Sequence, residues 1–248
     1  MIKRDDIVSY CNDVLDLHAF RDYGPMGLQF TGKDEVTKIG TAVSINQEVI
    51  DKAAQNKVDL LLVHHGLFWN NEPRYLDERM KRRLSSLEFH NISVLAYHLA
   101  LDAHPDIGNN IAALSEFDGQ VRKFGDIGWG KKLTRPYRKA DLSTIQFDHA
   151  LNGERTILYP YGPTQIRKVA AVVGGAPFYI HDAVREGYDL FITGEAAEPS
   201  MALAKELGIN FLALGHYNSE KSGVQILGWQ TAMQFGLTHE FLDVPNPV

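Results

Sequence analysis

The sequence predicts an α/β fold made of two related halves, each a mixed sheet flanked by helices. The first observation is an internal repeat, in which residues 38–63 align without a gap on residues 168–193 at a constant offset of 130. The second is that each copy reads as an apolar run, a helical stretch and another apolar run, as parallel strands joined by a crossover helix require. In both halves the pattern then continues through a further helical stretch to a third apolar run, at 92–98 and 209–216.

The other elements follow in chain order. Residues 3–20 predict an amphipathic helix, because Ile7, Cys11 and Val14 lie near helical spacing and two aspartates stand at its start. Residues 126–167 contain three prolines and several glycines, and we expect extra strands or loops there. The closing residues 243–248 predict an extended tail. We therefore place the halves at residues 1–125, with the first helix, and 126–248, with the bridging segment.

Composition restricts the class of protein. The 248 residues include one cysteine, Cys11, so an intramolecular disulfide and a thiolate cluster are excluded and a reducing compartment is expected. Any metal must be held by nitrogen and oxygen, and ten histidines are available. The sequence contains no apolar run of 18 residues that would predict a membrane helix, and its N-terminus lacks the apolar core of a signal peptide. We therefore expect a cytoplasmic protein.

The net charge of −6 argues against a protein that binds nucleic acid in bulk, without excluding it. The basic cluster at residues 79–83 lies beside acidic residues in a helix-like stretch, which is typical of a solvated helix face.

Histidines and carboxylates gather where the predicted strands end, which is where α/β sheets bind ligands. Each half has a histidine after its third strand and a carboxylate four residues later. A histidine pair follows the second strand of the first half, and a glutamate takes the second place of that pair in the other half. These residues are His64, His65, His98, Asp102, Glu195, His216 and Glu220.

Imidazoles and bridging carboxylates in such numbers match a two-metal hydrolytic site, in which the metals activate a shared water. Zn²⁺, Mn²⁺, Fe²⁺, Co²⁺ and Ni²⁺ all suit these ligands. His98 is interpreted as a ligand, a partner that orients one, or a proton shuttle. His104 precedes Pro105 in a predicted turn, and this position favours a structural role. We assign the remaining histidines to surface or core, and they are His18, His90, His149, His181 and His239.

Competing chemistry has little support in the sequence. There is no phosphate-binding G-x-x-x-x-G-K-[ST] motif and no G-x-S-x-G nucleophile elbow. Gly174-Gly175 could approach a phosphate but lacks the rest of a dinucleotide fingerprint. Cys11 is interpreted as a core residue and not as a nucleophile.

Five segments together resemble the Nif-three-like family of dinuclear metal proteins, also called GTP cyclohydrolase I type 2 homologs. They occur in the family's order over nearly the whole chain, and they are VHHGLFW, HLALDAHPDIGNN, FITGE, GHYNSEKSG and DVPNP. One departure is Met26, since the family's early turn commonly has asparagine there.

The resemblance implies two metal ions in a cleft between the halves and assembly into a toroidal homo-hexamer. The metal ligands that carry over are His64, His65, Asp102, His216 and Glu220, with Glu220 as the bridging carboxylate. The implied function is a dinuclear metal-dependent hydrolase that opens the purine ring of GTP at C8, and its substrate is a small molecule such as a nucleotide. His98 or Glu195 would then move the proton.

Two alternatives stay open at the level of sequence. One is a non-enzymatic metal-binding or regulatory ring scaffold that binds a partner protein. Five ligands for two metal ions leave coordination positions open, which favours an enzyme over this scaffold. The other is a ring whose local basic lining binds nucleic acid despite the overall negative charge.

Overall fold

The computed structural model describes residues 2–73, 75–144 and 156–248, so His149 and part of the bridging segment lie outside the described residues. The chain divides into two compact units, and each has its own sheet. Unit 1 contains residues 1–101 and 223–245, and unit 2 contains residues 102–222 and 246–248. This division differs from a boundary at 125/126, because strand β7 pairs inside the second sheet and the helix near the C-terminus returns to the first.

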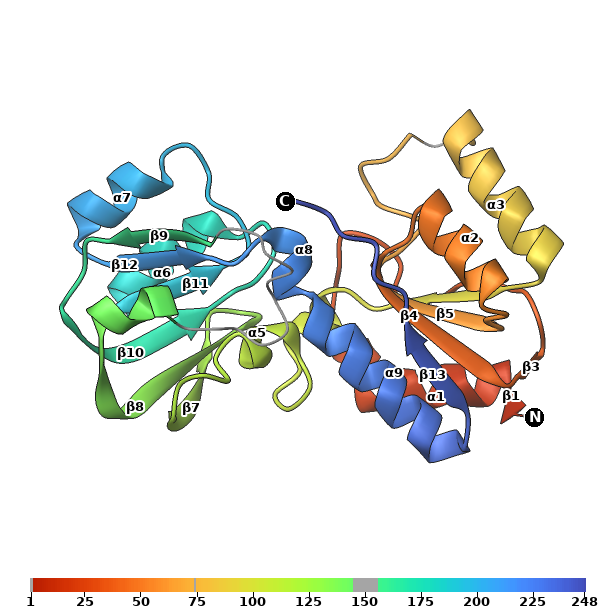
Figure 1. Ribbon diagram of the computed structural model, residues 1–248, viewed down its shortest axis with the longest axis horizontal. Helices are drawn as coiled ribbons and strands as arrows, with labels where there is room; N and C mark the ends of the chain where they lie inside the picture. Colours follow the sequence, from red (N-terminus) through yellow and green to blue (C-terminus); the bar gives the residue numbers. More distant parts are fainter. Residues whose placement is uncertain (1, 74, 145–155) are drawn as a thin grey trace. The chain divides into compact units, whose positions relative to one another are not determined.

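Unit 1 is built on a five-stranded sheet in the order β13-β4-β5-β6-β2 (Figure 1). Strands β4, β5 and β6 are mutually parallel, β13 is parallel to β4, and β2 is antiparallel to β6. Strands β1 and β3 form a separate antiparallel pair. The strands are β1 (Ile2–Lys3), β2 (Gly27–Phe30), β3 (Glu35–Val36), β4 (Lys38–Ser44), β5 (Leu60–His65), β6 (Ser93–Ala96) and β13 (Thr238–Phe241).

Helices cover both faces of this sheet. On one face α2 and α3 share an apolar cluster with β4, β5 and β6. On the other, α9 packs so closely on β4 that a Cβ on Gly228 would lie 2.3 Å from the Thr41 side chain. The helices are α1 (Arg4–Val14), η1 (Leu17–Ala19), α2 (Gln47–Gln55), α3 (Glu78–His90), α4 (Leu99–Asp102) and α9 (Lys221–Phe235).

Unit 2 repeats the parallel core in a six-stranded sheet ordered β7-β8-β10-β11-β12-β9, in which β10, β11 and β12 are parallel. The added strands β7, β8 and β9 pair antiparallel. The strands are β7 (Gly119–Phe124), β8 (Gly128–Arg138), β9 (Ile157–Pro160), β10 (Gln165–Ala171), β11 (Leu190–Thr193) and β12 (Asn210–Ala213). The helices are α5 (Asn109–Ala112), η2 (Lys139–Thr144), η3 (Pro177–Tyr179), α6 (Ile180–Arg185), α7 (Ser200–Leu207) and α8 (His216–Ser219).

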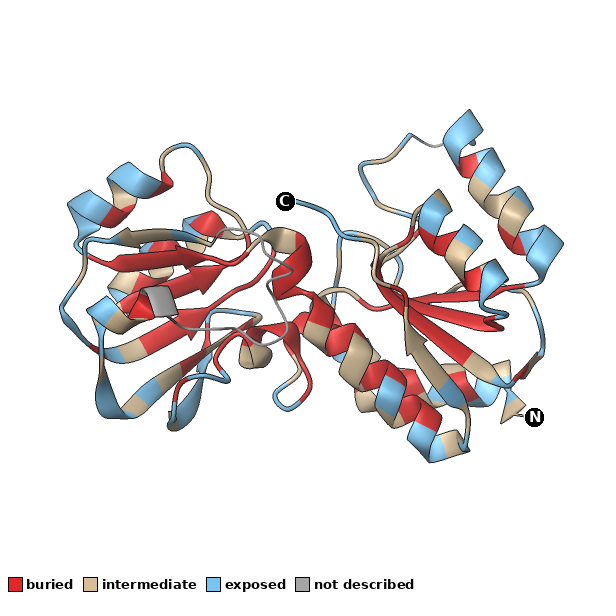
Figure 2. Ribbon diagram, in the orientation of Figure 1, coloured by how far each residue is buried: buried red, intermediate tan, exposed pale blue. Residues whose placement is uncertain are grey.

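Both central sheets are buried, as parallel strands with helices on their faces must be (Figure 2). In unit 2, α6 and α7 pack on one apolar cluster, while residues around α5 and η2 cover a second one. The predicted fold of two related α/β halves is therefore confirmed. Among the described helices, none combines the length and the apolar character that crossing a membrane requires.

The sequence repeat corresponds to one structural device used twice. One carboxylate oxygen of Asp59 accepts hydrogen bonds from the backbone N–H groups of Thr37 and Lys38 at the start of β4. Asp189 accepts from the backbone of Arg167 and Lys168 in the same way, at positions shifted by the same offset. These identical aspartates thus satisfy backbone donors at the start of β4 and at the register shift within β10, where the ladder would leave them without partners.

One sequence prediction needs correction and one strand was not predicted. The helix expected over residues 3–20 ends at Val14, because Asp16 takes a left-handed conformation with φ 44° and the chain continues as a short 3-10 turn. The expected tail is preceded by β13, a strand that was not predicted because three of its four residues are polar and show no alternation. The extra strands expected in the bridging segment are present, and the long strand β8 packs one face on the core of unit 2.

Candidate metal centre

Unit 1 brings three histidines together at the carboxyl ends of β5 and β6. The ring centroids of His64 and His65 are 4.7 Å apart, and that of His98 lies 5.0 Å from His64 and 5.5 Å from His65. One ring nitrogen from each residue lies within 4.8 Å of the others, as ligands of one metal ion would. Strand alternation alone would point the adjacent pair to opposite faces, so the end of β5 at His65 is what lets both rings reach one place.

Each of these imidazoles is held through its Nδ1 atom by a partner from its own unit. His64 Nδ1 lies 2.9 Å from the carbonyl oxygen of Tyr97, and His65 Nδ1 lies 2.8 Å from Ser44 Oγ. His98 Nδ1 lies 2.7 Å from the carboxylate of Asp22. Metal-binding histidines characteristically use one nitrogen for such a partner and present the other to the metal. The three rings are therefore oriented to bind through Nε2.

Asp22 belongs to this histidine group through its contact with His98, and the sequence analysis did not single it out. Its side chain is 1% exposed, and its second oxygen accepts the backbone N–H of Leu99 at 2.8 Å. Burial raises the pKa of this carboxyl, but the hydrogen bond and charge of His98 and the Leu99 N–H outweigh it and leave the pKa below its ordinary value. Asp22 is 76 residues from His98 and belongs to no motif, so nothing in the sequence indicated this pair.

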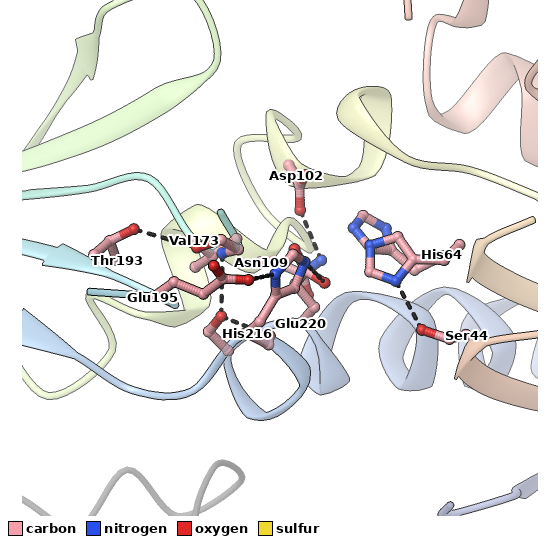
Figure 3. A network of polar contacts seen from close by, with 12 residues as sticks. Ser44, His64, Asp102, Asn109, Val173, Thr193, Glu195, His216 and Glu220 are labelled. Atoms are coloured by element: carbon pink, nitrogen blue, oxygen red, sulfur yellow. Dashed lines mark hydrogen bonds and ion pairs between the residues drawn. The ribbon is translucent and has the colours of Figure 1, made fainter. Parts of the chain in front are cut away.

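Unit 2 holds a second group of donors, drawn in Figure 3. His216, at the start of α8, lies with its Nδ1 2.5 Å from Glu195 Oε1 and its Nε2 3.3 Å from Glu220 Oε2. Burial opposes the charged ring, but the carboxylates of Glu220 and Glu195 raise the pKa of His216 to about 9. In the absence of a metal, a proton on this ring therefore balances the neighbouring negative charge.

Glycine allows the carboxylate of Glu220 to reach this position. Gly174 follows β10 with φ +64°, and a Cβ at this residue would lie 2.3 Å from Glu220 Oε1. Its backbone N–H donates to Ser219 Oγ at 3.2 Å. The glycine pair that the sequence left as a weak phosphate motif thus has another role at Gly174, which is to make room for a buried carboxylate.

Asp102 is, with Glu220, the second buried acid of this group, and it is 4% exposed. Its Oδ1 accepts a hydrogen bond of 2.9 Å from Asn109 Nδ2, and Asn109 is itself fully buried (Figure 3). Asn109 was not singled out in the sequence, although it belongs to the Gly108-Asn109-Asn110 segment that carried the family resemblance. Its amide fixes the carboxylate of Asp102 in one orientation.

Other sequence candidates lie apart from these groups. His104 Nδ1 accepts the backbone N–H groups of Asp106 and Ile107 at 3.2 and 3.3 Å, in agreement with a structural role. His239 contacts Thr41 Oγ1 at 2.8 Å within unit 1. Cys11 is fully buried, and burial raises the pKa of its thiol to about 11, which confirms it as a core residue.

The basic cluster at residues 79–83 is largely balanced by acids. Arg79 pairs with Glu72 and Asp77, and Lys81 pairs with Glu78. This arrangement is the solvated, charge-balanced helix face that the sequence predicted.

Comparison with known proteins agrees with the motifs in the sequence. The model of the Duf34/NIF3 (NGG1p interacting factor 3) family matches residues 2–247. A protein of Yersinia pestis named GTP cyclohydrolase 1 type 2 homolog is 36% identical over 250 residues, which cover 98% of both chains. Among solved structures, protein ybgI, of unknown function, superposes over 100% of both chains with a TM-score of 0.92 and 33% identity. TTHA1606 from Thermus thermophilus also covers 100% of both chains, with a TM-score of 0.82 and 30% identity.

Proposed function

Since this chain belongs to the Duf34/NIF3 family, we propose that it is a dinuclear metal-dependent hydrolase that opens the purine ring of a nucleotide. The observation that carries the proposal is the set of imidazoles in unit 1, each oriented through Nδ1 by a partner of its own. A packed protein core does not need histidines fixed in this way, whereas metal ligands and a neighbouring proton carrier do.

We propose that the donors of the two units bind the same pair of metal ions. Unit 1 offers imidazoles, while unit 2 offers the carboxylates of Asp102 and Glu220 beside His216. Two divalent cations need both kinds of ligand, since imidazoles alone leave their charge uncompensated. In this proposal the metal ligands are His64, His65, Asp102, His216 and Glu220. Glu220 is the bridging ligand, and the ions are Zn, Fe, Mn, Co or Ni.

The protein residues around the ligands suit the proton transfers of hydrolysis. Bound metal ions would lower the pKa of water toward 7 and stabilise developing negative charge. His98 is held at Nδ1 by the carboxylate of Asp22, which leaves its Nε2 placed to exchange a proton. Glu195 contacts Nδ1 of His216, so it orients this ligand and is placed to accept a proton as well.

The name GTP cyclohydrolase 1 type 2 homolog, which the relative from Yersinia pestis carries, suggests the substrate. We propose attack at C8 of the guanine ring of GTP, with formate as the released product. The test is to load the protein with each candidate ion, add GTP and measure formate. Glu220→Gln is the matched control, because it keeps the size of the side chain and removes its charge.

Formate release that requires a metal and is lost in Glu220→Gln would support the proposal. Two bound metal ions per chain without turnover of GTP or other nucleotides would contradict hydrolysis and favour a metal-binding scaffold. Fewer than one ion per chain in protein purified without metal affinity would contradict both. The same proposal includes a homo-hexamer, for which light scattering should give six times the mass of one chain.

A further inference from the structure

A pocket of about 360 Å³ lies in unit 1, between the loop that follows β5 and the first turns of α3. This volume is within the range of small-molecule sites. Its wall is mostly apolar and aromatic, with one acidic and one basic side chain. The lining residues used below are Phe68, Trp69, Glu72, Tyr75, Leu76 and Arg79.

Trp69 connects this pocket to the histidine group. Its ring stands perpendicular to that of His98 with 5.0 Å between centroids, and it lies 5.9 Å from His65. Phe68 and Trp69 also line the small space beside His64 and His98. A molecule in the pocket would therefore contact the same indole ring that packs on His98 and lies near the proposed ligand His65.

The apolar side chains around the pocket are left in contact with solvent. Phe68 is 36% exposed, Leu76 54% and Tyr75 71%. Large apolar groups that are exposed together around a concavity mark a binding site more often than single exposed residues do. Aromatic walls favour flat, unsaturated rings, because ring faces can stack on them.

One side of the pocket carries both hydrogen-bond donors and acceptors. Arg79 donates to both carboxylate oxygens of Glu72, with one bond of 3.1 Å, and is also 3.4 Å from Asp77. Guanidinium and carboxylate groups together can recognise the polar edge of a heterocycle, where donors and acceptors alternate.

We propose that this pocket binds the planar heteroaromatic ring of the substrate, stacked on Trp69 with its polar edge toward Glu72 and Arg79. The inference rests on the proposed function in identifying the ligand as substrate, and it specifies the substrate class as a purine base or a similar ring. The bound ring and the histidines His98 and His65 would then contact the same indole ring of Trp69.

Binding can be tested without turnover. Guanosine and adenosine carry the ring but no phosphate, and ribose serves as the probe without a ring. Calorimetric titration of the full chain in the presence of a chelator should show saturable binding of the purine nucleosides and none of ribose. Trp69→Leu should weaken nucleoside binding by at least roughly fivefold, since stacking on an aromatic side chain contributes that much or more per base.

Trp229→Leu is the matched control, because Trp229 is 56% exposed on α9 and does not line this pocket. It should bind nucleosides as the unchanged protein does. Tyr75→Ala is a second pocket variant that should fold normally, because Tyr75 is 71% exposed, and it too should bind more weakly. Equal binding in all variants, or no saturable nucleoside binding, would overturn the inference.

The outcomes separate this inference from the proposed reaction. Nucleoside binding that depends on Trp69, without formate release from GTP, would support the pocket and refute the reaction. Formate release with the same KM in Trp69→Leu and in the unchanged protein would refute the pocket and leave the reaction standing. Loss of self-association in Tyr75→Ala, with no nucleoside binding, would assign the pocket to a contact between copies and also overturn it.

Discussion

Replacing Gly174 by alanine should remove metal binding while leaving the fold of unit 2 intact. Gly174 has φ +64°, and the added Cβ would lie 2.3 Å from Glu220 Oε1 and 3.3 Å from His216 Nε2. To regain van der Waals contact, the carboxylate oxygen has to move by roughly 1 Å. Metal–ligand distances tolerate changes of only about 0.2 Å, so this displacement should take Glu220 out of coordination.

A second glycine separates the cost of the left-handed backbone from the loss of metal binding. Gly208 ends α7 with φ +67°, and a Cβ there would meet nothing within 4 Å. Alanine at either position carries the left-handed backbone cost of about 1–2 kcal/mol. For a chain of this size, each kcal/mol lowers Tm by about 2–4 °C. Gly208→Ala should show this loss alone, and Gly174→Ala should add the loss of metal.

The assay is elemental analysis after dialysis against the metal, together with thermal unfolding in chelator. We expect Gly208→Ala to retain the metal content of the unchanged protein and Gly174→Ala to lose most of it. If Gly174→Ala bound metal normally and resembled Gly208→Ala in Tm, the close approach of Glu220 to this backbone would not matter for coordination, and the prediction would be refuted.

Other predictions concern single side chains. Asn109→Leu removes the amide that holds Asp102 and should weaken metal affinity by about 10–100-fold in competition titrations, whereas unchanged affinity would deny it that role. Asp59→Ala leaves the backbone N–H groups at the start of β4 without their acceptor and should lower the free energy of unfolding by about 1–3 kcal/mol in urea titrations. A smaller decrease would mean that water replaces the carboxylate. The pKa of His216 is raised from 6.5 to about 9, so in chelator its stabilising effect should be complete below pH 6.5 and lost as the pH rises through 9. The free energy of unfolding, measured by chemical unfolding across this pH range, should fall in the unchanged protein and should not show this fall in His216→Asn. Cys11, whose thiol pKa burial raises to about 11, should react with iodoacetamide at about pH 8 only after unfolding, and rapid labelling of native protein would contradict its burial.

The fold was predictable because its signal is local and repeated. Continuous apolar runs such as residues 59–63 and 189–193 indicate strands buried on both faces, and each is part of a parallel sheet in the structure. Edge elements were harder to predict. Strand β13 is only partly buried and lies after a helix of unit 1, so its pairing with β4 depends on a contact between residues about 200 positions apart.

The candidate ligands were predictable for a similar reason. His64, His65 and His98 lie at or just after the ends of parallel strands, and neighbouring parallel strands deliver their carboxyl ends to one edge. The residues that orient them were not predictable in the same way. Asp22, Asn109 and Trp69 are ordinary residue types in loops and turns, and their contacts form only after the chain has packed.

The sequence by itself thus determined the two related α/β halves and the kinds of side chain at the strand ends. Periodicity and strand direction are properties of short segments, so they can be read without the fold. Only the tertiary structure decided which Nδ1 atoms are held, why Gly174 must lack a side chain, and that Trp69 separates a pocket from the histidines. Each of these depends on distances between segments remote in sequence, and packing alone fixes such distances.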